Sequence, residues 1–115
     1  MGQTLIAVAA HDDALRESLD LLLRAAGFEV LSYADEEALL ADPAAREAAW
    51  LLIDQSLPGA GGTALVQTMR DHGWDGVALL MLEHQDGRVA VEDPHMLVLE
   101  KPFDATAIMA VVKLP

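Results

Sequence analysis

Cysteine is absent from the sequence, and aromatic residues are scarce. Without cysteine the chain can have neither a disulfide framework nor a thiolate metal site. Only 4% of the residues are aromatic although 53% are hydrophobic, so the core must be aliphatic. The sequence also lacks an apolar run near the roughly 20 residues that cross a membrane, and it lacks a basic segment followed by a long apolar stretch at its amino terminus. We therefore expect a cytoplasmic location and no membrane contact.

Positive charge is scarce as well. The chain carries 19 acidic residues against 7 Lys and Arg, which gives a formal net charge of −12 at pH 7. Nucleic acids and anionic membranes would repel such a chain, so neither is an expected partner. The acidity serves solubility or steers an oppositely charged partner. At 115 residues the chain has the length of a single domain, and we place that domain at residues 1–115.

Short apolar runs alternate with helix-forming segments along the whole sequence. Leucines at helical spacing predict a helix over Ala14–Ala26, which Gly27 ends. Further helices are predicted to begin near Asp35, Thr63 and Asp104. The predicted strands are Leu5–Ala9, Phe28–Tyr33, Trp50–Ile53, Val77–Leu82 and Met96–Leu99. Strands that alternate with helices require crossover connections, so the sequence predicts an α/β fold with a mostly parallel sheet and helices on both faces.

One connection departs from this alternation of strands and helices. The interval between the strand ending at Leu82 and the strand beginning at Met96 is short and is interrupted by Gly87 and Pro94. A full crossover helix needs more residues and fewer turn formers. We therefore expect the fourth crossover helix to be shortened or missing.

Asp54 is the leading candidate for a functional residue. It ends the apolar run that begins at Trp50, and a loop containing Pro58 and Gly59 follows. A run of this kind indicates a buried strand, and sites in open α/β sheets are built at the carboxyl ends of strands. Asp54 is therefore either a reactive group or an acid that closes a strand.

The order of the elements and three motifs resemble the receiver domain of bacterial two-component response regulators. The motifs are Ala14-Leu15-Arg16-Glu17 with Gly27-Phe28-Glu29-Val30, then Leu51-Leu52-Ile53-Asp54 with Leu57-Pro58-Gly59 and Gly62, and finally Leu99-Glu100-Lys101-Pro102-Phe103. The resemblance implies a flavodoxin-like, doubly wound, five-stranded parallel sheet. It also implies phosphorylation on Asp54, with a Mg²⁺ held partly by an acidic pair after the first strand. A lysine matching Lys101 and a Thr or Ser matching Leu82 would assist.

The sequence departs from that pattern at four positions. Ala10 and His11 stand where the resemblance places the acidic pair, and neither is a good ligand for a hard cation that prefers oxygen. Leu82 stands at the hydroxyl position and cannot donate a hydrogen bond. Val98 replaces the aromatic or hydroxyl residue of the fifth strand. We therefore predict a degenerate receiver, or pseudo-receiver, that is not an enzyme and needs no cofactor.

Two interpretations remain open for the acids that are present. Asp12 and Asp13 cap the helix that follows, or they form a displaced acidic pair that holds Mg²⁺ together with Asp54. Asp54 itself is predicted to form an ion pair with Lys101. The Lys101–Pro102 peptide bond is cis if the resemblance extends to it.

Three functions follow from these residues. The first is a phosphorylation-independent protein-interaction module whose partner is a histidine kinase or another two-component signalling protein; it is compatible with a weak homodimer. The second is a receiver that still accepts a phosphoryl group on Asp54. The third is a cyclic dinucleotide sensor that uses the region from Glu83 to Pro102, where Arg88 could meet a phosphate and Pro102 closes the surface.

Overall fold

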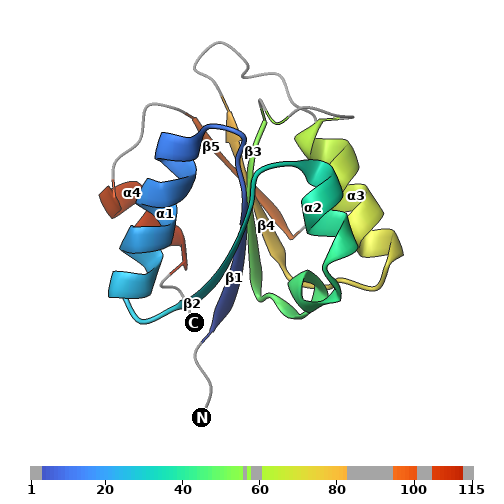
Figure 1. Ribbon diagram of the computed structural model, residues 1–115, viewed down its shortest axis with the longest axis horizontal. Helices are drawn as coiled ribbons and strands as arrows, with labels where there is room; N and C mark the ends of the chain where they lie inside the picture. The colour runs from blue at the N-terminus through green and yellow to red at the C-terminus, as the bar shows by residue number, and fades with distance from the viewer. Residues whose placement is uncertain (1–3, 56, 58–60, 83–94, 101–104, 113–115) are drawn as a thin grey trace.

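The computed structural model describes residues 4–55, 57, 61–82, 95–100 and 105–112. Within these ranges every strand of the sheet is parallel to its neighbours, and the strand order is β2-β1-β3-β4-β5 (Figure 1). In chain order the elements are β1 (Leu5–Ala9), α1 (Asp13–Ala25), β2 (Glu29–Tyr33), α2 (Glu36–Ala41), the 3-10 helix η1 (Pro43–Glu47), β3 (Trp50–Asp54), α3 (Gly62–Asp71), β4 (Val77–Leu82), β5 (Met96–Glu100) and α4 (Ala105–Val112). The predicted doubly wound α/β fold is confirmed.

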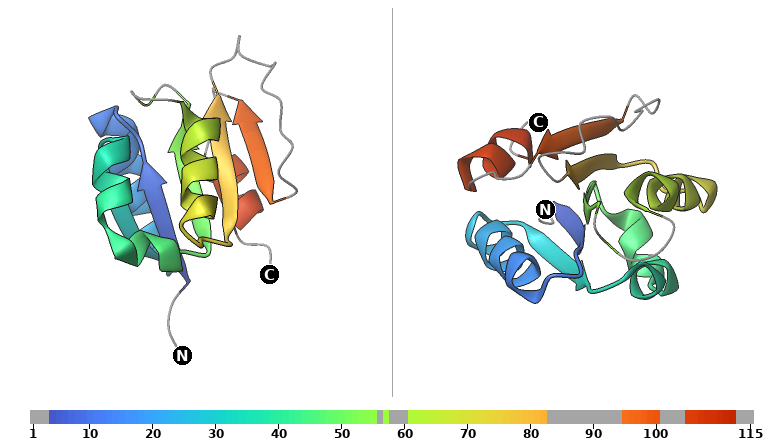
Figure 2. Two further views of the ribbon diagram at one scale, coloured as in Figure 1. Left: turned by 90° about the vertical axis from the view of Figure 1, so that its right-hand side faces the viewer. Right: turned by 90° about the horizontal axis from the view of Figure 1, so that it is seen from above.

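Helices cover both faces of the sheet. Seen from above, α1 and α4 lie on one side and α2 and α3 on the other (Figure 2). Successive residues of β1 alternate between the two layers, because side chains on a strand point to opposite faces. Ile6 and Val8 belong to the core under α1 and α4, whereas Ala7 and Ala9 belong to the core under α2 and α3. The core is mostly aliphatic, as the composition predicts, and it also contains the rings of Tyr33 and Trp74.

The ends of α1 show why the helix begins and ends where the sequence predicts. The Asp12 carboxylate accepts hydrogen bonds from the backbone N–H groups of Ala14 and Leu15, which satisfies donors that the first turn leaves free. At the other end Gly27 adopts φ 99°, and the N–H of Phe28 donates to the carbonyl of Leu23. A residue with a Cβ adopts that φ only at a cost, so Gly27 ends the helix. None of the helices in the described ranges is long and apolar enough to cross a membrane.

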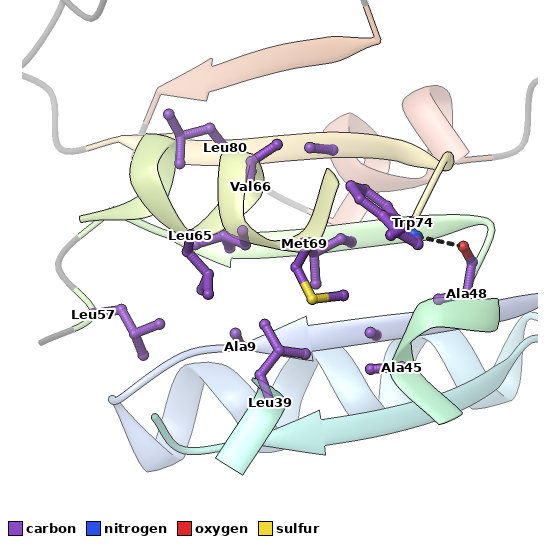
Figure 3. Packing of buried hydrophobic residues seen from close by; sticks show 14 of the residues in the cluster. Ala9, Leu39, Ala45, Ala48, Leu57, Leu65, Val66, Met69, Trp74 and Leu80 are labelled. Carbon is purple, nitrogen blue, oxygen red and sulfur yellow. Dashed lines mark hydrogen bonds between the residues drawn. The ribbon is translucent and has the colours of Figure 1, made fainter. Parts of the chain in front are cut away.

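The alanine-rich segment before β3 forms a short 3-10 helix that sequence spacing did not assign. Asp42 caps η1 by accepting from the N–H of Ala44, and Pro43 occupies its first turn. Small side chains at Ala45 and Ala48 let this segment approach the buried ring of Trp74 closely (Figure 3). The indole N–H of Trp74 donates to the carbonyl of Ala48 at 2.8 Å. This bond joins the turn before β3 to the turn before β4.

One expectation about the fold concerns the connection from β4 to β5. The expected shortened or missing crossover helix falls in residues 83–94, which lie outside the described residues. It therefore stays a prediction. On either side of this connection β4 and β5 pair over five residues of each strand, from Ala78 with Met96 to Leu82 with Glu100.

Candidate functional site

Asp54 lies at the carboxyl edge of the sheet, in its central strand. It is the last residue of β3, pairs in register with Met81 of β4, and directly follows Ile53, which pairs with Ala9 of β1. Its exposed fraction is 1%, and among the described residues it is the charged side chain that is buried. A carboxylate in such a place needs a compensating partner, because burying an unpaired charge is costly. Lys101, the partner that the sequence predicts, lies outside the described residues.

Ala10 directly follows β1, whose last residue, Ala9, pairs with Ile53 at the carboxyl edge of the sheet. Ala10 is completely buried, and its N–H donates to the carbonyl of Tyr33, which fixes the turn to β2. Its own carbonyl accepts a hydrogen bond at 2.8 Å from the guanidinium of Arg16. His11 is exposed. The two positions where the resemblance requires carboxylates therefore supply no side-chain oxygen.

Both neighbouring acids have contacts within the first turn of α1. Oδ1 of Asp12 accepts from two backbone N–H groups, at 2.8 Å from Ala14 and 3.2 Å from Leu15. Oδ1 of Asp13 pairs with Nη2 of Arg16 at 2.5 Å, and the Asp13 side chain is 80% exposed. Asp12 is thus the N-cap of α1, and Asp13 is the first residue of the helix.

The described residues at this edge offer few side-chain oxygen ligands for a Mg²⁺ ion. Mg²⁺ demands near-octahedral oxygen ligation. Asp54 is the carboxylate at the end of β3, Ala10 offers a methyl group, and Asp12 caps a helix. Over the ranges that the structure describes, no three His, Asp or Glu side chains gather into a group that could hold a metal ion.

Buried apolar side chains lie at the same edge of the sheet as Asp54. Leu82 ends β4 with an exposed fraction of 1%, and it belongs to the same core cluster as Leu57, which is also buried. Figure 3 shows Leu57 at the carboxyl end of the sheet, near Ala9. The N–H of Leu57 donates to the carbonyl of Asp54 at 3.0 Å, so a tight turn holds this leucine in place. The hydroxyl position of the resemblance is therefore part of the hydrophobic core.

Gln55, which the sequence analysis did not single out, ties this edge to α3. Its N–H donates to the carbonyl of Met81 at 2.9 Å, and its side-chain Oε1 accepts from the N–H of Gly62 at 3.1 Å. The sequence does contain a signal for this contact. The helix α3 begins at Gly61-Gly62, so no Ser, Thr, Asp or Asn stands at the cap position and a side chain from elsewhere must accept from its first N–H groups. A Cβ at Gly62 would lie 2.6 Å from that same oxygen, so this glycine allows the close approach.

The outer strand β5 carries the fourth degenerate position. Val98 pairs in register with Leu80 and has an exposed fraction of 41%, and its neighbour Leu97 is similarly exposed. Arg88 and Pro102, the candidate ligand contacts, lie outside the described residues. Their predicted roles stay predictions.

A hydrogen-bonded pair whose two pKa values are shifted lies at the end of β2, the edge strand next to β1. The hydroxyl of Tyr33 donates to Oδ2 of Asp42 at 2.7 Å. Burial of the ring, followed by the bond to Asp42, raises the pKa of Tyr33 above its usual range. The same bond and a bond from the N–H of Ala44 lower the pKa of Asp42. The pair connects β2 to the segment after α2.

Comparison with known proteins agrees with this architecture. The family model of the response regulator receiver domain matches residues 6–113. The transcriptional regulatory protein FixJ of Azorhizobium caulinodans is 33% identical over 109 residues, which are 92% of this chain and 52% of FixJ. FixJ of Bradyrhizobium diazoefficiens is 32% identical over 111 residues, covering 94% of this chain and 54% of that protein. The chain thus spans about half the length of these curated relatives.

Solved structures give the same result. The crystal structure of FixJ-N superposes with a TM-score of 0.82 at 26% identity, over 98% of this chain and 93% of that one. The response regulator StyR superposes with a TM-score of 0.86 at 25% identity, over 97% of this chain and 58% of that one. With the family match over most of its length and this parallel five-stranded sheet, the chain belongs to the response regulator receiver domain family.

Proposed function

We propose that this receiver domain is a pseudo-receiver, a phosphorylation-independent interaction module in a two-component pathway. Its partner is a histidine kinase or another two-component signalling protein. The observation that carries the proposal is the apolar enclosure, by which we mean the buried side chains of Ala10, directly after β1, and Leu82, at the end of β4, on the two strands that flank β3. The carboxylate is present, but these groups stand where phosphoryl chemistry needs charge and hydrogen-bond donors.

The chemistry explains why this enclosure opposes phosphorylation. Transfer of a phosphoryl group spreads negative charge over three equatorial oxygens, and catalysis consists almost entirely of positioning and neutralising that charge. A methyl at Ala10 and an isobutyl group at Leu82 neutralise nothing. Asp54 is also only 1% exposed, which limits the access of a phosphodonor.

The outer face of α1 offers a contact surface that does not depend on phosphorylation. Leu21 is 70% exposed, whereas Leu19 and Leu23 on the inner face are buried and anchor the helix. We take Leu21 as the apolar contact of the proposed interface, because it is exposed on a helix that its buried leucines hold in place. Because the chain has a net charge of −12, we expect basic residues on the partner surface that receives Leu21.

Intact mass measurement tests the proposal. The chain is incubated with acetyl phosphate and Mg²⁺, in parallel with an Asp54→Asn variant. We expect no added phosphoryl group on either protein. A gain of one phosphoryl group that is lost in Asp54→Asn would overturn the pseudo-receiver assignment in favour of a phospho-accepting receiver.

A second measurement addresses the contact surface. For a histidine kinase domain that binds the chain, calorimetric titration should give the same affinity for the wild type and for Asp54→Asn. Leu21→Ser should weaken binding without lowering the stability of the fold, since Leu21 is not part of the core. An affinity that depends on Asp54 and not on Leu21 would contradict the proposed docking mode.

A further inference from the structure

The carboxyl end of α3 is attached to the start of β5 through Arg70. Nη1 of Arg70 donates to the carbonyl of Gly76 at 2.5 Å, and Nη2 donates to the carbonyl of His95 at 3.2 Å. The guanidinium carbon lies 4.4 Å from the ring centroid of Trp74, in cation–π geometry. The His95 carbonyl also accepts from the N–H of Ala78, immediately before the pairing of β4 with β5. Arg70 therefore fixes the point where β5 enters the sheet.

The amino end of α3 is attached to the Asp54 edge through Gln55. This residue directly follows Asp54, and its side-chain oxygen accepts from the N–H of Gly62, the first residue of the helix. Its own N–H is bound to the carbonyl of Met81 in β4. A displacement of the backbone at Asp54 would therefore displace the first turn of α3.

Between these two attachments α3 is a stiff body. It contains ten residues, Gly62–Asp71, and so is about 15 Å long. Leu65, Val66 and Met69 are buried along its inner face. Because these side chains pack together against the sheet, we expect any movement of α3 to be a rigid-body shift of the whole helix. Packed helices and cores shift between discrete arrangements and do not deform continuously.

We propose that α3 is a mechanical connector that couples the Asp54 edge to the start of β5 through Gln55 and Arg70. This inference goes beyond the proposed docking function, because it assigns a route between two ends of the sheet. The route avoids Leu82 and Val98, two of the four positions at which this chain departs from its family's pattern. Both attachments bind through side chains, so each can be cut by substitution while the backbone ladder of the sheet stays intact.

Native-state hydrogen exchange on the full chain tests the connector. The readout is the protection of the β5 amides, Met96–Leu99, divided by the protection of the β1 amides, Ile6–Val8. Gln55→Met cuts the amino attachment, and Arg70→Met cuts the carboxyl attachment. The matched controls are Gln67→Met on the exposed face of α3 and Arg46→Met at the exposed end of η1.

The connector predicts a specific pattern of coupling. In the wild type, Gln55→Met should lower the β5-to-β1 protection ratio by about five-fold or more, as expected for coupled sites. In the Arg70→Met background the same substitution should change the ratio by less than about two-fold, because the connection is already cut. Gln55→Glu keeps the acceptor oxygen and should retain the wild-type ratio.

Three outcomes would overturn the proposal. The first is a Gln55→Met effect confined to Gln55 and the first turn of α3. The second is an equal effect on β5 in both backgrounds, which would mean that the sheet carries the coupling. The third is a uniform loss of protection in β1 and β5, which would assign both residues to global stability alone.

Discussion

Replacement of Leu82 by valine or by threonine, two side chains of nearly the same shape, tests whether the end of β4 next to Asp54 is hydrophobic. Leu82 is 1% exposed and packs in the core cluster that contains Leu57 and Leu80. Leu82→Val removes about one methylene group and should cost ~1 kcal/mol of unfolding free energy. Leu82→Thr has nearly the same shape as Leu82→Val but buries a hydroxyl, which should cost a further ~1–3 kcal/mol if no partner is present.

The difference between the two variants is the informative quantity, because the cavity left by the missing methylene is the same in both. Urea unfolding followed by circular dichroism measures each midpoint and slope, and equal slopes allow the free energies to be compared directly. The apolar enclosure predicts that Leu82→Thr is less stable than Leu82→Val. A threonine variant as stable as the valine variant, or more stable, would show that the hydroxyl finds a polar partner there and would refute the reasoning.

Three further predictions concern other parts of the fold. Trp74→Phe should lower the free energy of unfolding by about 2–4 kcal/mol in urea titrations, because it removes the buried bond to Ala48 and part of the ring; the half-buried Trp50→Phe serves as the control and should cost less. Gly62→Ala should cost about 1–3 kcal/mol, since its Cβ would meet the Gln55 oxygen and the Leu80 side chain. Melting temperature should fall as pH rises above the ordinary tyrosine pKa of 10.0, because burial raises the pKa of Tyr33 and only the unfolded state ionises there.

The controls for these predictions are internal to the chain. Tyr33→Phe should abolish most of the alkaline decrease, and an unchanged decrease would assign it to other groups. At acid pH the sign is opposite, because the pKa of Asp42 is lowered by its bond to Tyr33. Stability from Asp42 is present above its ordinary pKa of 3.8 and is lost as pH falls below that value. A Gly62→Ala variant of wild-type stability would contradict the close packing at the start of α3.

The regular elements were predictable because their signals are local. The apolar runs that form β3 and β4 and the leucine spacing of α1 each lie within one segment, and the structure places them within one or two residues of the prediction. The Asp12 cap was also predictable, since the acid directly precedes its helix. Crossover connections then make the sheet parallel. The flavodoxin-like arrangement of its strands was expected only from the family resemblance.

The contacts that organise the two ends of α3 were not predictable in the same way. Arg70 reaches His95, which is 25 residues away in the chain, and Trp74 reaches Ala48 across 26 residues. No spacing rule connects such pairs, because they meet only after the sheet has formed. Gln55 is closer to its partner, but a glutamine after a strand has no fixed role in sequence patterns.

The candidate site was predictable where the family resemblance could be carried over residue by residue. The structure places Ala10 and Leu82 in the core and Asp54 at the carboxyl end of β3, in register with Met81. It adds the nearly complete burial of Asp54, which composition and spacing cannot reveal. The roles of Lys101, Arg88 and Pro102 stay predictions, because these residues lie outside the described ranges.

Binding of a divalent cation at Asp54 is the most direct test of the central claim, since receiver phosphorylation requires that ion. Millimolar Mn²⁺ serves as the probe, and broadening of backbone amide signals in NMR spectra reports its position. The apolar enclosure predicts that the wild type and Asp54→Asn show the same broadening, confined to exposed acids such as Asp13. Saturable broadening centred on Gln55 and His11 in the wild type, and lost in Asp54→Asn, would contradict the account.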